Sequence, residues 1–395
     1  MNIHSKAQFS FSSSPLIANY LVALLVGLFV GMVWPLISLI LESEGYEQSW
    51  IGLNAAAAPL AILLCAPLAP RLIHKFGLRK CIFFSGLWMA ILFLAFPLWK
   101  GLVPWFILRF ASASLGAVLW VANETWILNI AKEKNRGKLV SIYVLSLNLG
   151  FALGPALITL TGIEGWTPFV VLSLIAGLIS LPMLFLRRTE PSLPKRSKTS
   201  LLLLVIGVPV LMMAIVAEGM IDQSLLSFLP LYAIGNGLTQ DAGLLLLILM
   251  TIGALTLQLP IGAIVDRFNN MLLLLIGGIT YILIPFLVIE LISTKLPLWT
   301  VAFLWGAIGT MMYTASLAII SNKFGSDKIT NISALLVVMF EIGGVIGPLS
   351  SGVTIDLFGY DAFMYLMSLS GLAFVLFFIL RYIYIRSKGG GLNEI

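Results

Sequence analysis

The chain has 395 residues, of which 60% are hydrophobic and 10% charged, and its formal net charge is +6. A soluble globular domain carries about a quarter charged residues, so this composition excludes that class and favours an integral membrane protein. The basic excess follows from membrane topology and anionic lipid, and we expect no nucleic-acid partner.

Long apolar runs recur along the whole chain. Crossing about 30 Å of hydrocarbon takes roughly 20 apolar residues in a helix, and an open sheet cannot span lipid because its edge groups stay unsatisfied. The sequence therefore predicts an all-α membrane protein with twelve transmembrane helices in two six-helix bundles. The runs begin near Leu16, Trp50, Cys81, Leu102, Leu139, Trp166, Leu201, Ala242, Met271, Leu298, Ile329 and Ala362.

Basic residues occupy every second connector between these runs. Of the 23 Lys and Arg residues, only Lys100 and Lys295 fall on the opposite side, and Arg109 lies within a span. By the positive-inside rule both termini are cytoplasmic. A connector rich in Pro, Ser and basic residues predicts a flexible linker at mid-chain. The expected domains are a cytoplasmic tail (1–15), a first bundle (16–186), a linker (187–200), a second bundle (201–385) and a cytoplasmic tail (386–395).

The two halves repeat at an offset of about 193 residues. Parallel repeats of this kind are typical of transporters whose halves rock around a central site. Small residues let helices approach closely and proline permits bending, so we expect the fifth and eleventh spans to pack tightly across the two halves. The matching positions are Gly150, Gly154 and Pro155 with Gly343, Gly347 and Pro348, and Gly116 with Gly309.

Several motifs resemble those of the major facilitator superfamily. Gly262, Asp266 and Arg267 resemble its loop motif, Gly150 to Pro155 its glycine-proline motif, and Arg109 upstream of Gly116 its span-four arginine motif. Further segments are similar to the YcaD-like branch, namely Glu124-Thr125-Trp126, Asn135-Arg136-Gly137, Ile142-Tyr143 and Gln258 to Gly262. The resemblance implies a monomeric transporter that works by alternating access, with the first, fourth, seventh and tenth spans lining a central cavity.

The connector after the second span departs from that loop motif. It runs from Pro70 to Lys80, with Pro70 and His74 where the family's pattern has glycine and aspartate. In the family this loop is a charge-paired latch between helix ends, so we place the latch first at Asp266 and Arg267. A simple helix cap with positive-inside charge is the alternative.

Five charged residues lie inside predicted spans, where a charge costs about 2.5–3.5 kcal/mol at the bilayer centre. They are Arg109, Glu124, Glu218, Asp222 and Glu341. Glu218 and Asp222 are four residues apart and share one helix face, where two carboxylates cannot easily both ionise. We predict that this pair couples protons or binds a cationic substrate. A salt bridge to Arg109 is the structural alternative.

The remaining candidates are less specific. Glu341 is predicted to couple protons, to contact substrate or to bond a neighbouring helix, and Glu124 to act as a gating or structural partner of a connector cation. Trp120 and Tyr313 match in the repeat and, with Trp34, are candidates for stacking on an organic substrate.

Enzyme, metal and cofactor signatures are missing from the sequence. It has no phosphate-binding Gly-Lys-Ser/Thr loop, no metal-ligand spacing and no nucleophile-base pair on one face. We therefore predict no enzyme activity, no metal and no cofactor. The predicted function is proton-coupled efflux of a small organic solute through a bacterial-type inner membrane. Proton-symport uptake of a nutrient or metal-chelating metabolite is the alternative, and a non-transporting receptor is a further one.

Overall fold

The structure is a computed structural model that describes residues 14–130, 136–185, 208–323 and 326–389. Its regular elements in those ranges are all helices, and twelve are long and apolar enough to cross a membrane. The predicted all-α fold class is therefore confirmed. The expected linker 187–200 and most of both expected tails lie outside the described residues, as does the predicted seventh start at Leu201.

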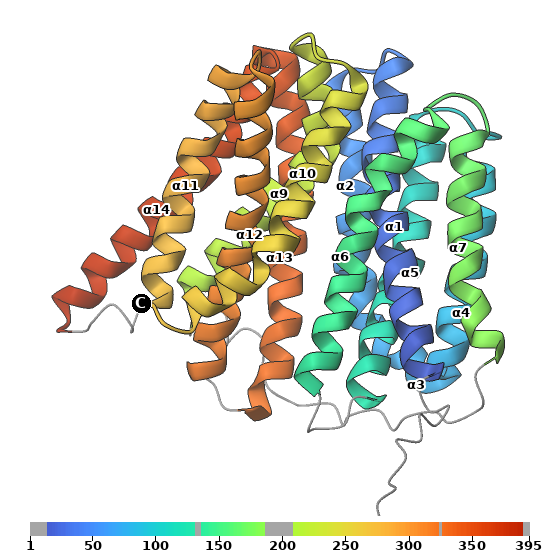
Figure 1. Ribbon diagram of the computed structural model, residues 1–395, viewed down its shortest axis with the longest axis horizontal. Coiled ribbons are helices and arrows are strands. Elements are labelled where there is room, and N and C mark those ends of the chain that lie inside the picture. Colours follow the sequence, from blue (N-terminus) through green and yellow to red (C-terminus); the bar gives the residue numbers. More distant parts are fainter. Residues whose placement is uncertain (1–13, 131–135, 186–207, 324–325, 390–395) are drawn as a thin grey trace, which may run out of the picture.

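The spanning helices divide between the two halves of the chain (Figure 1). The first half contains α1 (Ser14–Ser43), α2 (Gln48–Cys65), α4 (Leu78–Ala95), α5 (Leu102–Ile130), α6 (Arg136–Thr161) and α7 (Thr167–Phe185). The second half contains α9 (Pro209–Gly235), α10 (Gln240–Val265), α11 (Asn270–Leu291), α12 (Lys295–Lys323), α13 (Ser326–Phe358) and α14 (Asp361–Ser387).

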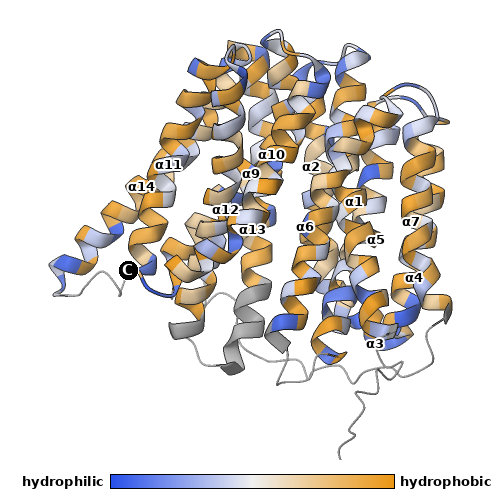
Figure 2. Ribbon diagram, in the orientation of Figure 1, coloured by the Kyte–Doolittle hydropathy of each residue, from blue (hydrophilic) through white to orange (hydrophobic). Residues whose placement is uncertain are grey.

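An even number of spans places the start of α1 and the end of α14 on one face of the molecule, the lower one in Figure 1. We call it the terminal face, and the opposite one the closed face. Many side chains exposed along the helices are large and apolar, such as Leu259 and Leu160. Hydrophobic residues, in orange, predominate along the helices in Figure 2. An exposed apolar surface of this extent is what a bilayer covers.

The connector after α2 is helical, which corrects the expectation of a loop from Pro70 to Lys80. A 3₁₀ turn, η2 (Ala66–Leu68), leads into the short helix α3 (Ala69–Phe76). Pro70 is accommodated because it sits in the first turn, where its missing N–H is not needed. The chain turns into α4 at Gly77, whose φ of 85° is accessible to glycine at no steric cost.

The repeated glycines pack within each half, which corrects the expectation that they join the two halves. A Cβ added at Gly150 would lie 2.2 Å from the carbonyl oxygen of Leu24 in α1, and one at Gly343 would lie 2.0 Å from that of Val216 in α9. Gly154 and Gly347 are equally close to the same two helices. The motif therefore lets α6 touch the backbone of α1, and α13 that of α9, because no side chain separates them.

Different glycines join the halves. Near the closed face, a Cβ at Gly52 in α2 would lie 2.2 Å from the carbonyl oxygen of Pro348 in α13. One at Gly352 in α13 would lie 2.1 Å from the carbonyl oxygen of Gln48. Helices α10 and α6, and α1 and α9, also contact each other across the halves. The closed face is thus sealed by direct backbone packing of α2 on α13.

Candidate functional site

The acidic pair lies in the middle of α9. Glu218 is 4% exposed and its Oε2 has no hydrogen-bond partner, whereas Asp222, one turn on, is half-buried. The two carboxyls interact electrostatically, as their predicted position on one helix face requires. No cationic side chain in the described part of the chain pairs with Glu218. The structure therefore places a buried carboxyl without a counter-ion beside a second, partly accessible one.

Tyr281 of α11 and Gly309 of α12 complete the surroundings of this pair. Tyr281 is 1% exposed, its hydroxyl has no partner, and it lies within electrostatic range of both carboxyls. A Cβ at Gly309 would lie 3.3 Å from that hydroxyl and 3.8 Å from Oδ1 of Asp222. Glycine at this position leaves room for both groups. The sequence offered no signal for Tyr281, a lone tyrosine in an apolar span, and Gly309 stood out only through the repeat.

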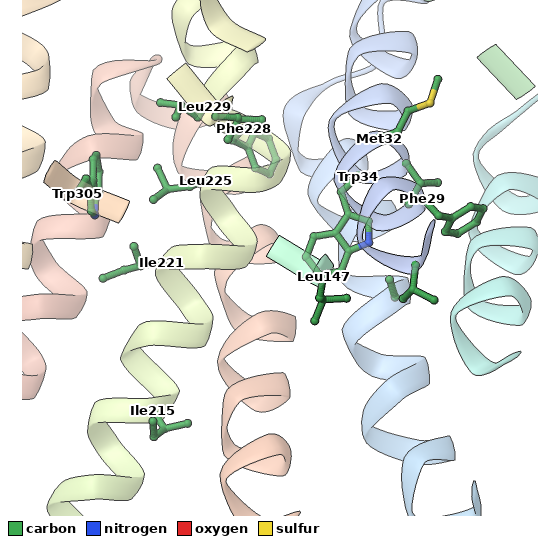
Figure 3. Packing of buried hydrophobic residues seen from close by; sticks show 14 of the residues in the cluster. Phe29, Met32, Trp34, Leu147, Ile215, Ile221, Leu225, Phe228, Leu229 and Trp305 are labelled. Carbon is green, nitrogen blue, oxygen red and sulfur yellow. The ribbon is translucent and has the colours of Figure 1, made fainter. Parts of the chain in front are cut away.

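Trp305 lies one turn from Gly309 on α12, and its indole N–H is buried without a partner. Figure 3 shows it toward the α9 residues Ile221 and Leu225, in keeping with the contact between these two helices. A buried donor of this kind is costly to leave unpaired. It adds a hydrogen-bonding group to the side of α12 that faces the acidic pair.

Exposed residues of the two halves lie near each other on α5 and α12. Tyr313 is 41% exposed, yet it lies within electrostatic range of buried Glu218 in its own half and of Glu124 in the other. Glu124 is exposed, and a Cβ at Gly116 would meet nothing within 4 Å. Tyr313 of one half and Glu124 of the other are therefore exposed and within electrostatic range of each other, and we call the region that they and Gly116 border the central space.

The three candidate stacking residues differ in their access to this space. Trp120 is half-buried and lies one turn from both Gly116 and Glu124 on α5. It therefore remains, like Tyr313, a candidate for lining the central space. Trp34 is 8% exposed and belongs to the hydrophobic core around α1, with Phe29 and Met32 (Figure 3). Little of its surface is open to a solute.

Arg109 lies two helical turns from Gly116 on α5, so the two share a face. It is 2% exposed; Nη1 donates to Oδ1 of Asn54 in α2 at 3.2 Å, and Nε has no partner. The side-chain nitrogen of Asn54 is buried and unpaired too. The salt bridge to Glu218 or Asp222 that we considered is not formed. Arg109 and Asn54 instead present two unpaired donors together.

Glu341 is buried in α13, and its Oε2 has no partner, so it makes no helix–helix hydrogen bond through that atom. One turn on, a Cβ at Gly344 would lie 2.9 Å from Cγ of Gln223 in α9 and 3.0 Å from Cβ of Pro59 in α2. Glu341 thus lies close to the line along which α13 meets both halves.

A polar cluster that the sequence did not predict joins the halves at the closed face. The carboxylate of Asp356 accepts the backbone N–H of Gln48 at 2.9 Å and that of Ser49 at 2.7 Å, and also the Ser49 hydroxyl. Tyr360 donates its hydroxyl to Oε1 of Glu42 at 2.8 Å, and the Gln48 side chain donates to the same carboxylate. We call these five residues the closed-face cluster. Burial and the neighbouring Glu42 and Asp356 raise the pKa of Tyr360, so its neutral hydroxyl is favoured in this cluster.

The loop motif after α10 is not engaged in this conformation. Asp266 and Arg267 are exposed, and neither forms an ion pair with a described residue. A Cβ added at Gly262 would meet nothing within 4 Å, so this glycine makes no close approach either. The contact that holds two helix ends together lies at the opposite face, in the closed-face cluster.

Comparison with known proteins identifies the family of this chain. The family model described as Major Facilitator Superfamily matches residues 20–348. The uncharacterized MFS-type transporter YfkF of Bacillus subtilis is 25% identical over 361 residues, covering 89% of this chain and 92% of its own. The uncharacterized MFS-type transporter YcaD of Escherichia fergusonii is 25% identical over 334 residues, covering 82% of this chain and 85% of its own.

Solved structures share the fold at low sequence identity. The nucleoside transporter NupG superposes with a TM-score of 0.76 at 13% identity, covering 93% of this chain and 98% of its own. A D-xylose-proton symporter gives a TM-score of 0.74 at 17% identity, covering 92% and 97%. At this level of identity the likeness concerns the fold alone.

Proposed function

The chain belongs to the major facilitator superfamily, and we propose that it exports a small organic solute by proton antiport. The observation that carries the proposal is Glu218: a buried carboxyl without a counter-ion among the described residues, one turn from Asp222 and within electrostatic range of exposed Tyr313 in the central space. An intramembrane acid of this kind is expensive to keep unless it has a function.

The proposed mechanism follows from electrostatics. Two carboxyls one turn apart and partly removed from water hold a proton more readily than either does in water. When the halves rock, water access to the pair changes sides, so a proton taken up on one side is released on the other. A solute that binds only when the pair has lost its proton then moves in the opposite direction. Glu341 is proposed as a secondary proton or substrate contact.

Orientation follows from the basic residues. We place the terminal face in the cytoplasm of a bacterial-type inner membrane, because the basic connectors lie on that side. The α2–α13 packing would then seal the external side, and we propose that the central space is reached from the cytoplasm, where an exporter loads its solute. We propose a monomer, because one chain supplies both halves of the site.

Other motif residues have proposed gating roles. Asp266 and Arg267 would form charge pairs with a neighbouring helix end when the cytoplasmic side closes. Glu124, which is exposed here, would gain a cationic partner in that state. Gly150, Gly154 and Pro155, like Gly343, Gly347 and Pro348, would transmit the rocking by keeping α6 on α1 and α13 on α9. Gly150, Gly154 and Pro155 resemble the glycine-proline motif of antiporters in this family, and that resemblance supports export.

The test is solute-driven proton movement in proteoliposomes with an imposed pH gradient and a panel of organic solutes. We expect Glu218→Gln and Asp222→Asn each to abolish proton movement, while Glu290→Gln, an exposed acid near the end of α11, leaves it unchanged. Wild-type proton movement in both site variants would contradict the proposal.

The same assay decides direction. Export by antiport moves solute and proton in opposite senses, so an acidic exterior drives solute out of the compartment that represents the cytoplasm. Proton-linked entry of solute from the acidic side would instead establish symport uptake, the alternative function.

A further inference from the structure

We propose that the central space binds a zwitterionic solute, with Arg109 and Asn54 holding its carboxylate and the Glu218–Asp222 pair holding its amine. This inference rests on the proposed function, since it names the class of solute that the transporter carries. It begins from an imbalance within the membrane: the described part of each half contains buried charge that no described residue neutralises.

The first pole is a donor site in the first half. Arg109 directs one nitrogen to Asn54 and leaves Nε unpaired, while the amide nitrogen of Asn54 is unpaired as well. Both side chains are almost fully buried. A guanidinium and an amide that converge in a dry site match the two oxygens of a carboxylate. Without such a ligand, each unpaired donor costs free energy.

The second pole is an acceptor site in the second half. Oε2 of Glu218 and the hydroxyl of Tyr281 are buried and unpaired, and Asp222 is partly accessible beside them. No cationic side chain in the described ranges neutralises Glu218. A primary ammonium group offers three donors and a positive charge, which suits two carboxyls and a phenol oxygen. The amine of the solute would replace the proton on the pair, so binding and proton release are linked.

The two poles lie in different halves, on α5 and α9, and at different depths. Arg109 is seven residues from the start of α5 and Asp222 thirteen from the end of α9, and both of these helix ends lie at the closed face. At 1.5 Å per residue, Arg109 and Asp222 are separated by about 9 Å along the helix axes, and Glu218 lies about 6 Å deeper than Asp222. The long Arg109 side chain and a small solute together cover such a span. Trp120 and Tyr313 would flank the apolar part of the solute.

Matched ligands test the proposal on purified wild-type protein. The panel contains amino acids and dipeptides, each beside counterparts that lack the amine or the carboxylate, such as L-phenylalanine with phenethylamine and 3-phenylpropanoate. Binding is followed by thermal stabilisation and titration. We expect at least one zwitterion to bind about tenfold or more tightly than both of its counterparts, because each lost charged contact is worth at least that factor.

Variants assign the poles. Arg109→Gln should remove the advantage of the zwitterion over its amine-only counterpart, and Asp222→Asn its advantage over the acid-only counterpart. Arg71→Gln and Glu290→Gln, which alter exposed residues, are the controls and should leave both ratios unchanged. The wild-type ratios need no variant, so the test holds even if Arg109→Gln does not fold.

Several results would overturn the proposal. Equal binding of a zwitterion and its amine-only counterpart would mean that Arg109 contacts only other residues of the protein and no solute carboxylate. If no zwitterion in the panel stabilised the protein, the proposed solute class would be rejected. Failure of the proposed function looks different. Zwitterion binding without proton movement would reject antiport and keep the site, whereas proton-coupled transport of amine-only solutes would keep antiport and reject the site.

Discussion

Asp356 caps helix α2 from the other half of the chain: its Oδ1 accepts the backbone N–H of Gln48 at 2.9 Å across 308 residues. Glu47, at the N-cap position of α2, makes no side-chain capping bond of its own. A helix N-terminus has unsatisfied N–H groups and a partial positive charge, both of which a carboxylate satisfies. The first turn of α2 is therefore complete only while the two halves meet at the closed face.

Replacing Asp356 with alanine should weaken this closure. Loss of an N-terminal cap costs about 0.5–2 kcal/mol, enough to change the ratio of closed to open molecules several-fold. Spin labels at positions 44 and 241, two exposed sites on the closed face, report the separation of the halves once Cys65 and Cys81 are replaced by serine. We expect Asp356→Ala to increase the population of long distances. An unchanged distance distribution, with Glu290→Gln as the control, would show that the cap does not hold the closure.

Gly52 should tolerate no side chain in the closed state. A Cβ there would lie 2.2 Å from the carbonyl oxygen of Pro348, so the backbone must move, at a typical cost of about 1–3 kcal/mol. Gly52→Ala should therefore populate long distances between the same labels. Gly177→Ala is the matched control, since a Cβ there would meet only Ala90 at 3.9 Å. Equal behaviour of the two variants would argue against backbone packing as the seal.

The closure should also weaken at high pH through Tyr360. The pKa of Tyr360 is raised above its usual value of about 10 in the closed state, by burial and by Glu42 and Asp356. A raised pKa means that the closed state favours the neutral hydroxyl. Its contribution is complete below pH 10 and is lost as the pH rises toward the raised pKa. Label distances measured between pH 8 and pH 11 should lengthen above pH 10, and Tyr360→Phe should remove this component of the change.

Removal of the Tyr281 hydroxyl should separate stability from function. The hydroxyl is buried without a partner, so Tyr281→Phe removes an unsatisfied group and should leave the unfolding temperature unchanged or raise it. The same change removes a polar neighbour of Glu218 and Asp222 and should reduce proton-coupled flux several-fold. Unfolding temperature and proteoliposome flux are measured on the same preparation. Wild-type flux would place Tyr281 outside the coupling site.

Local sequence properties were sufficient to predict the fold class. Eleven of the twelve predicted spans begin within a few residues of the first residue of a described helix. The reason is that a run of about 20 apolar residues has only one favourable state in lipid, the helix. The acidic pair was predictable for a similar reason: residues four apart in a helix share a face wherever that helix packs.

Relationships between distant segments needed the tertiary structure. The glycine spacing in α6 and α13 predicted close packing, but α1 and α9 were identified as partners only by the fold. The sequence offered no signal for Asp356, because its bond to Gln48 exists only where α13 lies against α2.

The sequence by itself determined that this chain is a twelve-span membrane protein with costly charges at Arg109, Glu124, Glu218, Asp222 and Glu341. The length of an apolar run, the distribution of basic residues between connectors and the spacing of residues on one helix face depend on local sequence only. The bilayer acts on each of them without regard to how the helices pack. Tertiary structure decided which of those charges stay unpaired, that Arg109 meets Asn54 instead of the acidic pair, and which face is sealed. Pairing depends on distances between helices far apart in the chain, and only their packing sets those distances.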